Sequence, residues 1–429
     1  MTERTRLGAY LDPATVPDAP PPRAQMAAAT RELHDAVDAN APFLHPSLRT
    51  IQRDLRASAE VAAWQEAKSA FVLAADGAWS ELPHLYARYG TGGTSELIAA
   101  LRRLERADAA IVTDCGMQAV ALVADALIAP GAHVVAMRQV YNKTRTFFEL
   151  SAKRAGATLA LVDDGDLDTL AAMLRPETSL VFAETFTNPL VRAQDVPALA
   201  AITARVPGAR LVIDSTIATP WGLRAPLLQQ GVHVVVGSLT KALGGQDAAL
   251  GGYIATNDAP LANQIMDLVA MRGGILDDAR ARLVAEHLPA AERAHEQRCA
   301  TAARVAAALA RHPRIERAFH PSLPDHPDAA VIARDYTRTG SLLSFRVKGA
   351  DEAAHRAISD RLCATGVPRF ALSFDGLVTK INHHRTVSEY FTPAETIARL
   401  GIDRLIRVGV GLEDADDLIA CLYWALAPA

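Results

Sequence analysis

The residue in this sequence best placed for covalent chemistry is a lysine that follows an apolar stretch. Three consecutive valines at 234–236 predict a buried strand, and Ser238, Thr240 and Lys241 follow it. Burying a lysine is costly unless the amine is paired or used covalently, because desolvation disfavours its charged form. The two hydroxyls can donate to a phosphate, and the glycine pair at 244–245 lets the backbone approach a ligand closely. The segment therefore predicts a site for a ligand that carries an amine-reactive group and a phosphate.

A second predicted strand, at 211–214, ends on the carboxylate of Asp214. Open parallel sheets bind ligands just outside the carboxyl ends of their strands. A reactive amine, phosphate donors and an acid at one such edge fit pyridoxal 5′-phosphate (PLP), held as a Schiff base by Lys241, with Asp214 keeping the pyridine nitrogen protonated. Taken singly, Asp214 could cap the turn that follows it and Lys241 could open a helix at the surface. The two strands together favour the cofactor site.

The length and composition predict a globular chain of the size of an enzyme. The 429 residues are half hydrophobic with a formal net charge of −4, which predicts two domains, or one with an appendage, and no nucleic-acid or membrane-surface partner. No apolar run approaches the roughly 18–20 residues of a membrane span, and no signal peptide is expected. Four scattered cysteines without a CxxC pair argue against disulfides or a metal site and for a reducing compartment. We expect a cytoplasmic protein that acts on a small molecule and holds no metal.

The hydrophobic pattern predicts three regions. Residues 1–85 form an N-terminal extension, extended or poorly ordered over the proline-rich 1–25 and helical at 26–39 and 57–74. Residues 86–290 alternate helices and apolar strands, which predicts an α/β domain with a mostly parallel sheet and helices on both faces. Residues 291–429 predict a smaller α+β domain. The expected strands are 109–113, 133–137, 158–162, 180–183, 211–214, one starting at about 232, 341–347 and 405–410, and the expected helices are 95–106, 117–128, 143–155, 197–205 and 279–309.

Short strings in a fixed order connect this chain to a known family. They are Tyr86-Ala87-Arg88, Cys115-Gly116-Met117, Tyr141, Glu184, Asn188-Pro189, Asp214-Ser215-Thr216, Ser238-Leu239-Thr240-Lys241 and residues 405–414. On these strings the chain resembles, from about residue 86 to its C-terminus, the Cys/Met-metabolism PLP-dependent enzymes, which include cystathionine γ-synthase, methionine γ-lyase and the sulfhydrylases. The resemblance implies the PLP-dependent transferase fold of type I and a homo-oligomer, a dimer with shared sites that pairs further into a tetramer.

The resemblance also implies a set of cofactor contacts. Lys241 would form the Schiff base and then move protons between the α and γ carbons of the substrate, and Asp214 would pair with the pyridinium. Tyr141 would stack on the ring and act as an acid or base, although a tyrosine taken alone is more often a packed aromatic. The remaining cofactor contacts would be Gly116 and Met117 at a helix N-terminus, Ser238, Thr240, Thr216, and Tyr86 and Arg88 reaching the neighbouring subunit's phosphate.

The substrate contacts implied are Arg407, Ser373, Asn188 and Lys143. Arg407 would grip the α-carboxylate in a bidentate pair that lysine cannot match, with Ser373 nearby. Lys143 departs from the family, whose members carry glycine and then a small residue or cysteine after the tyrosine. This lysine suggests an acidic or strongly polar γ-substituent, or else it points to solvent at the start of a helix. The family's Ser-Leu-Gly-Gly motif is also altered, to residues 373–376 Ser-Phe-Asp-Gly.

The reaction expected is PLP-dependent γ-elimination on a homoserine- or methionine-type L-amino acid. The same residues permit γ-replacement, in which a thiol captures the intermediate formed from an O-activated homoserine. A β-eliminating C–S lyase, an aminotransferase and a non-catalytic PLP-binding protein are the further alternatives. The combination of Lys241, Asp214 and Arg407 argues against the last, because a protein without catalysis has no need of a carboxylate clamp.

Overall fold

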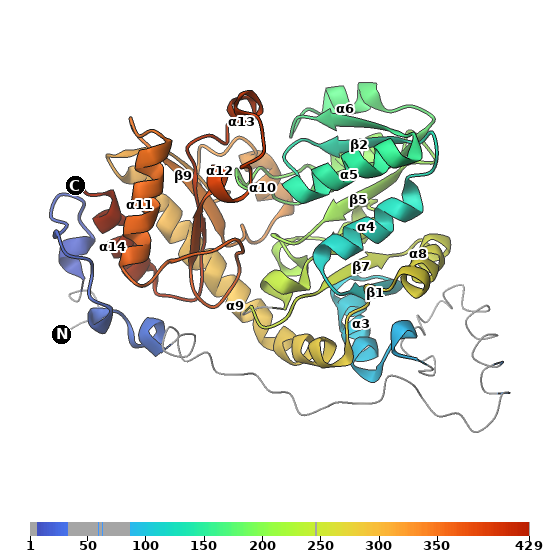
Figure 1. Cartoon of the computed structure of the whole chain (residues 1–429), viewed down its shortest axis with the longest axis horizontal. Helices are drawn as coiled ribbons and strands as arrows, with labels where there is room; N and C mark the ends of the chain where they lie inside the picture. Colours follow the sequence, from blue (N-terminus) through green and yellow to red (C-terminus); the bar gives the residue numbers. More distant parts are fainter. Residues whose placement is uncertain (1–6, 33–58, 60–61, 63–85, 245–246, 429) are drawn as a thin grey trace. The chain divides into compact units, whose positions relative to one another are not determined.

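The computed structural model describes residues 7–32, 59, 62, 86–244 and 247–428 (Figure 1). They divide into two compact units, each described by itself below. The large unit contains residues 86–186 and 194–291, and the small unit contains 7–32, 187–193 and 292–428. Of the predicted helix 26–39, residues 28–32 are described and helical. Residues 26 and 27 are described but not helical, because Met26 has extended backbone after the preceding turn. Residues 33–39, and all of the predicted helix 57–74 except residues 59 and 62, lie outside the described residues.

The large unit is built on a seven-stranded sheet with the order β1-β7-β6-β5-β4-β2-β3. Strands β6, β5, β4, β2 and β3 are mutually parallel, and β7 runs antiparallel to β1 and β6. The mostly parallel sheet predicted from the sequence is therefore confirmed, with an antiparallel strand that the prediction lacked. The strands are β1 Ala109–Thr113, β2 His133–Met137, β3 Thr158–Val162, β4 Thr178–Glu184, β5 Arg210–Asp214, β6 Val234–Gly237 and β7 Gly252–Thr256.

Helices cover this sheet, and α4 and α5 are seen packed across it in Figure 1. Strands β1, β2 and β7 are buried at every residue, which is typical of strands covered on both faces. Each connecting helix begins soon after a strand, so the N-termini of α4 and α5 lie near the carboxyl ends of β1 and β2. The helices are α3 Gly92–Glu105, α4 Gly116–Leu127, α5 Asn142–Ala155, α6 Leu167–Met173, α7 Val196–Thr203 and α8 Ala259–Arg272.

The small unit has a five-stranded sheet with the order β10-β11-β12-β9-β8, antiparallel except between β10 and β11. Its strands are β8 Ile315–Phe319, β9 Leu342–Val347, β10 Arg369–Phe370, β11 Lys380–His383 and β12 Ile406–Gly409. Helix α9, Asp278–Arg311, has its first residues in the large unit and the rest in this one. The other helices are α10 Ala329–Asp335, α11 Glu352–Ala364, α12 His384–Val387, α13 Ala394–Leu400 and α14 Ala415–Leu426.

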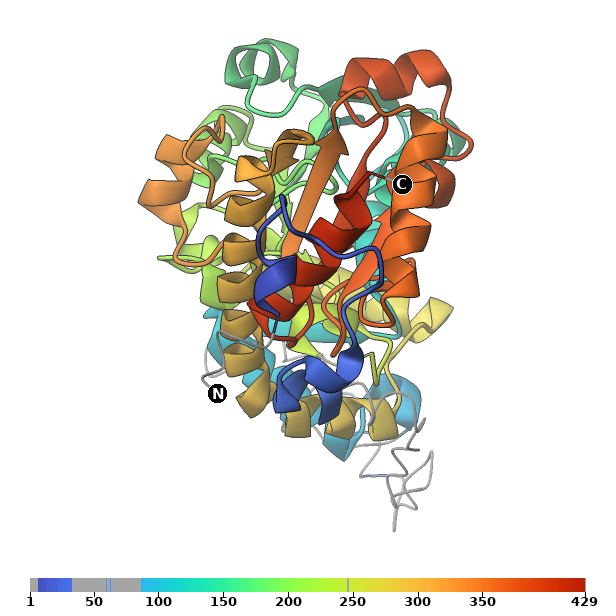
Figure 2. The same ribbon diagram turned by 90° about the vertical axis from the view of Figure 1, so that its left-hand side faces the viewer.

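The N-terminal segment 7–32 packs on α14 of the same unit (Figure 2). Trp424 donates its indole N–H to the carbonyl of Asp18 at 2.8 Å, and Asp417 accepts the backbone N–H of Ala27 at 2.9 Å. Leu7, Tyr10 and Met26 are buried in the same apolar cluster as α14, and 3-10 turns form at Gly8–Tyr10 and Arg23–Gln25. The expectation of extended or poorly ordered chain is thus wrong at the turns Gly8–Tyr10 and Arg23–Gln25, whereas Pro22 has the expected extended backbone.

A carboxyl group in the core of the large unit makes the stability of the protein depend on pH. Glu105 ends α3, is 1% exposed, and accepts the hydroxyl of Tyr253 at 2.5 Å. Burial raises the pKa of Glu105 from 4.5 to about 7. Since the folded-state pKa lies above the unfolded value, the stabilisation is fully present below about pH 4.5 and is lost as the pH rises through about 7. At about 1.4 kcal/mol per pKa unit, roughly 3 kcal/mol is at stake.

Glu105→Gln should remove this loss, because the amide stays neutral and its oxygen can still accept from Tyr253. Melting temperatures of the holoenzyme measured from pH 5 to 8.5 should fall for the wild type relative to the variant as the pH rises. Glu149→Gln, on the exposed face of α5, is the matched control and should follow the wild type. Parallel curves for wild type and Glu105→Gln would mean that Glu105 does not set the pH dependence.

Candidate active site

Lys241 lies on a kinked turn just beyond the carboxyl end of β6. The turn, Leu239–Leu243, is a short π-helix in which Lys241 leaves helical geometry, with φ −94° and ψ −138°. A Cβ on Gly244 would lie 1.8 Å from the carbonyl oxygen of Leu239, so only glycine lets the chain double back here. The neighbouring parallel strand β5 pairs with β6 and ends on Asp214, opposite Val236. The amine and the acid predicted from the sequence therefore belong to adjacent strand ends of one sheet.

Two threonine hydroxyls brace these strand ends. Thr216 donates its backbone N–H to Asp214 Oδ1 at 2.8 Å, and its hydroxyl oxygen accepts the backbone N–H of Ser238 at 2.9 Å. The hydroxyl of Thr240 is bonded to the backbone of Gly251 in both directions, at 3.1 and 3.2 Å. Thr216 thus joins β5 to β6, and Thr240 fixes the lysine turn to the residues before β7.

A second carboxyl group, which the sequence analysis quoted only as part of a motif, lies beside Asp214. Glu184 ends β4, pairs in register with Asp214 and is 6% exposed. Burial and then the charge of Asp214 raise the pKa of Glu184 well above its usual value, and burial raises the pKa of Asp214 as well. Two adjacent carboxyls hold one negative charge more easily than two. A cationic pyridinium against Asp214 would favour ionised Asp214 beside protonated Glu184.

Glu184 also positions Tyr141. The backbone N–H of Tyr141 donates to Glu184 Oε1 at 2.5 Å, and this places the tyrosine at the start of α5 with its side chain 41% exposed. Exposure of a large aromatic beside a strand edge is compatible with a stacking surface for a flat ring. Lys143, two residues on, is exposed in the first turn of the same helix.

The N-terminus of α4 meets the lysine segment at a glycine. A Cβ on Gly116 would lie 3.0 Å from the Cβ of Ser238, and one on Gly252 would lie 2.4 Å from the carbonyl oxygen of Cys115. Gly252 is required for this close approach, and a side chain on Gly116 would need Ser238 to shift, so the first residue of α4 lies against Ser238. Helix N-termini of this kind attract phosphate. The cradle, the amine of Lys241 and the acid Asp214 fit a phosphorylated pyridine aldehyde.

Tyr86 and Arg88 lie on the surface of the large unit. Both are exposed; the guanidinium of Arg88 stands 5.4 Å from the ring of Tyr86 and donates to the carbonyl of Ala270 at 2.8 Å. Arg88 is thus held in place by its own chain while its surroundings remain open to solvent in the single chain.

In the small unit, Arg407 lies on β12 and is 3% exposed. It donates to the carbonyls of Leu372 and Ser373, at 3.0 and 3.3 Å, and to the amide oxygen of Asn188 at 3.4 Å. These three acceptors are neutral oxygens, and they orient the guanidinium. The structure therefore brings together Arg407, Ser373 and Asn188, three of the four predicted substrate contacts, whereas Lys143 belongs to the large unit.

Two neighbours of Arg407 were not found from the sequence. The guanidinium stands 5.7 Å from the ring of Phe374, the residue that follows Ser373. Burial, and then the charge of Arg407, lower the pKa of His384 to about 3, so this histidine is neutral at physiological pH and adds no second positive charge. The departure at residues 373–376 was the available signal for Phe374; His384 gave none, because only the fold brings it near Arg407.

A lysine on a turn after a parallel strand, with an acid on the adjacent strand and a helix N-terminus beside it, defines a PLP-dependent enzyme of fold type I. The chain belongs to the Cys/Met metabolism PLP-dependent enzyme family, whose model matches residues 50–427. No helix in the described part of the chain has the length and apolar character needed to span a membrane.

The relatives of this chain carry out both lyase and synthase reactions. The chain is 34% identical to an O-succinylhomoserine sulfhydrylase of Pseudomonas aeruginosa over 81% of its length and 85% of the relative's. It is 30% identical to an L-methionine gamma-lyase of Fusobacterium nucleatum, over 81% of this chain and 87% of the relative. It is 32% identical to a chloroplastic cystathionine gamma-synthase of Arabidopsis thaliana, over 80% of this chain and 60% of the relative. A cystathionine gamma-lyase structure from Lactobacillus plantarum, solved with L-serine, superposes with a TM-score of 0.75 at 27% identity, over 80% of this chain and 88% of that one.

Proposed function

We propose that this enzyme catalyses γ-elimination on a homoserine- or methionine-type L-amino acid, releasing the γ-substituent, a 2-oxo acid and ammonia. The observation that carries the proposal is the placement of Lys241 on its kinked turn beside the strand that ends in Asp214. γ-Elimination removes a proton first from the α carbon and then from the β carbon, so it needs one mobile base. The similarity to methionine and cystathionine γ-lyases supports the same reaction.

In the proposed mechanism PLP, when bound, supplies an electron sink that stabilises negative charge at the substrate carbons. Lys241 would hold the cofactor through its Nζ and, once the substrate is bound, would take up the α proton at the same atom. Asp214 keeps the pyridine nitrogen protonated, with Glu184 carrying the proton that the pair retains. Tyr141 would cover the ring face, and Gly116, Met117 and Ser238 would donate to the phosphate. The Thr240 hydroxyl, whose proton is bonded to the Gly251 carbonyl, would hold the turn beside the phosphate. Arg407 binds the α-carboxylate and fixes which substrate bonds can break.

γ-Replacement is the second candidate, because the P. aeruginosa relative is a sulfhydrylase. In that reaction a thiol adds to the same unsaturated intermediate in place of water-driven release of the 2-oxo acid. A panel of methionine, cystathionine and O-acetyl-, O-succinyl- and O-phosphohomoserine, each with and without a thiol, separates the two. A 2-oxo acid formed without thiol supports elimination, and product formed only with thiol supports replacement. Absence of both, with cofactor left as the pyridoxamine form, would overturn the proposal in favour of aminotransfer.

We further propose a cytoplasmic homodimer with shared sites, which pairs into a tetramer. Exposed Tyr86 and Arg88, with Arg88 held by Ala270, support a role in binding the neighbouring subunit's phosphate. The described cysteines, all unpaired, agree with a reducing compartment.

Shared sites predict that two inactive variants restore each other. Arg88→Ala and Lys241→Ala chains, co-expressed with different tags and purified as the mixed dimer, should recover one of two sites, since one site then receives both intact residues. Activity is measured at limiting PLP, where the loss of Arg88 has its largest effect. Mixed dimers no more active than the average of the two parents would exclude sharing through Arg88.

Substitution of Lys143 tests whether the enzyme favours substrates with an acidic γ-substituent. Lys143→Ala should lower kcat/KM about 2- to 5-fold for substrates with an acidic γ-substituent, because an exposed cation contributes modestly, and should leave neutral substrates unaffected. Lys153→Ala, exposed in the last turn of the same helix, is the matched control. Equal effects on acidic and neutral substrates would assign Lys143 to solvent.

A further inference from the structure

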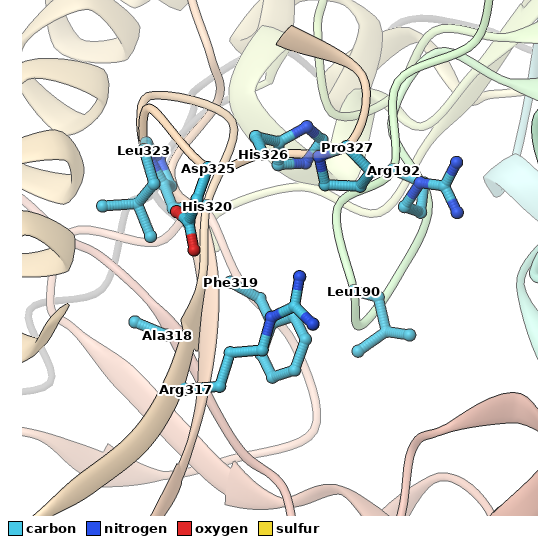
Figure 3. A pocket seen from close by; sticks show the side chains of 10 residues that line it. All are labelled: Leu190, Arg192, Arg317, Ala318, Phe319, His320, Leu323, Asp325, His326 and Pro327. Atoms are coloured by element: carbon cyan, nitrogen blue, oxygen red, sulfur yellow. The ribbon is translucent and has the colours of Figure 1, made fainter.

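The small unit contains a cavity of about 290 Å³ outside the substrate contacts described above (Figure 3). Its apolar lining comes from Leu190, Phe319, Leu323 and Pro327. Arg317 and Asp325 also line it, and both residues are exposed to solvent at its open side. The volume lies at the lower limit of the roughly 300–1,000 Å³ usual for ligand pockets, which suits a molecule the size of an amino acid.

The charges in this cavity are separated and opposite. Arg192 is neutralised by a bidentate pair with Asp328, at 2.7 and 2.8 Å. Arg317, whose guanidinium stands 5.1 Å from the ring of Phe319, makes no ion pair with any residue in the described part of the chain. The same holds, among those described residues, for Asp325.

The two histidines of the cavity add no charge at neutral pH. Burial lowers the pKa of His320 to about 4, and burial also lowers the pKa of His326. The cavity therefore offers one cation, one anion and an apolar wall.

We propose that this cavity binds one small zwitterionic amino acid with an apolar side chain, its carboxylate on Arg317 and its ammonium group on Asp325. The apolar side chain packs on Phe319 and Leu190. A simple anion offers no opposite charge to Asp325, and a simple cation offers none to Arg317. A zwitterion can form an ion pair with each of the two side chains.

The cavity is connected to Arg407 by one short segment. Residues 187–193 contribute Leu190 to the cavity wall and Asn188 to the hydrogen bond with Arg407. The segment is held at several points: Val191 accepts from His326 at 3.1 Å, and Pro189 accepts from the hydroxyl of Ser344 at 2.9 Å. A ligand packed on Leu190 therefore contacts the same segment whose Asn188 accepts a hydrogen bond from Arg407. We expect bound amino acid to change the KM for substrate several-fold; this step, unlike the binding itself, rests on the proposed role of Arg407.

The binding test uses N,N-dimethyl-L-leucine, a zwitterion whose tertiary amine cannot form a Schiff base with PLP. Isothermal titration calorimetry of the holoenzyme should show saturable binding. N-acetyl-L-leucine, which keeps only the anion, and L-leucine amide, which keeps only the cation, should bind about 10-fold more weakly or worse. Binding of the N-acetyl compound as tight as that of the zwitterion would overturn the proposal in favour of a simple anion site.

Substitutions in the cavity lining test whether the amino acid binds there. Arg317→Gln and Asp325→Asn should each weaken binding of the zwitterion about 10-fold or more. Arg399→Gln and Asp360→Asn, which make the same charge changes at exposed positions of α13 and α11, should not. Arg407→Gln should leave calorimetric binding intact, which separates the cavity from the substrate site. Absence of binding, or binding unchanged in Arg317→Gln and Asp325→Asn, would refute the cavity as an amino-acid site.

The kinetic test measures the KM for substrate with and without the dimethyl compound. A several-fold shift that disappears in Arg317→Gln supports the connection through residues 187–193. Binding without any shift would refute that connection and leave the site. Failure of the enzyme to turn over any γ-substituted amino acid would refute the proposed function, and calorimetry would still decide the site.

Discussion

Replacing Lys241 with alanine should abolish turnover, lowering kcat by at least about 10⁴-fold. The variant loses both the covalent anchor of the cofactor and the base that takes up the α proton, and a positioned base alone contributes 10²- to 10⁴-fold. The visible absorption of the lysine-bound cofactor, near about 420 nm, should disappear with the activity. Absorbance spectra and single-turnover rates with excess enzyme measure both effects.

The control for this prediction shows that the Lys241→Ala variant is still folded. Lys241 is only partly buried and its turn is held by the backbone of Ser238 and Gly251, so the variant should keep its secondary structure and still bind PLP without the covalent bond. Lys241→Arg, which preserves the charge but is a far poorer nucleophile, should be as inactive as alanine. Turnover retained in either variant would contradict the mechanism.

Replacing Arg407 with alanine should lower kcat/KM by roughly 30- to 5,000-fold, corresponding to about 2–5 kcal/mol for one partner of a buried charge pair. The larger part should appear in KM, because the guanidinium binds a carboxylate that does not react. Arg407→Lys keeps the charge but cannot present two parallel N–H groups, so it should recover only part of the loss. Steady-state kinetics with the best substrate of the panel measure these effects.

A substrate analogue provides the matched control for Arg407. With the substrate α-carboxamide, which lacks the carboxylate, wild type and Arg407→Ala should be equally poor. Loss of activity through misfolding would instead lower the rate with both compounds. An equal loss with both compounds would therefore remove Arg407 from substrate binding and make it a support for residues 372–373.

The sequence was most informative where apolar runs are continuous. Strands β1, β2 and β3 have the bounds predicted for them, and helix α9 differs from its prediction by one or two residues at each end. Strands β1 and β2 are buried at every residue, and the buried residues of α9 recur with helical spacing, so the pattern shows these elements directly. Strand β3 was found from its apolar run although only Val162 is buried. Strand β11, with the sequence Lys-Ile-Asn-His, was not predicted because it is buried yet largely polar.

The site was only partly accessible from the sequence. Lys241 and Asp214 could be inferred because each ends its own apolar run. Glu184 could be quoted but not given a role, since its effect on Asp214 comes from the register of β4 against β5, 30 residues apart in the chain. The inclusion of residues 187–193 in the small unit likewise has no local signal, because it depends on side-chain contacts with residues more than a hundred positions later.

The attachment of the N-terminal segment to α14 has a consequence for synthesis on the ribosome. The bonds from Ala27 to Asp417 and from Trp424 to Asp18 join residues 390 and 406 positions apart. At about 5–20 residues per second, the first residues emerge roughly 20–80 s before their partners exist. The nascent chain therefore carries Leu7, Tyr10 and Met26 without their α14 partners while the seven-stranded sheet is already being made, and chaperones that shield apolar segments have that interval in which to act.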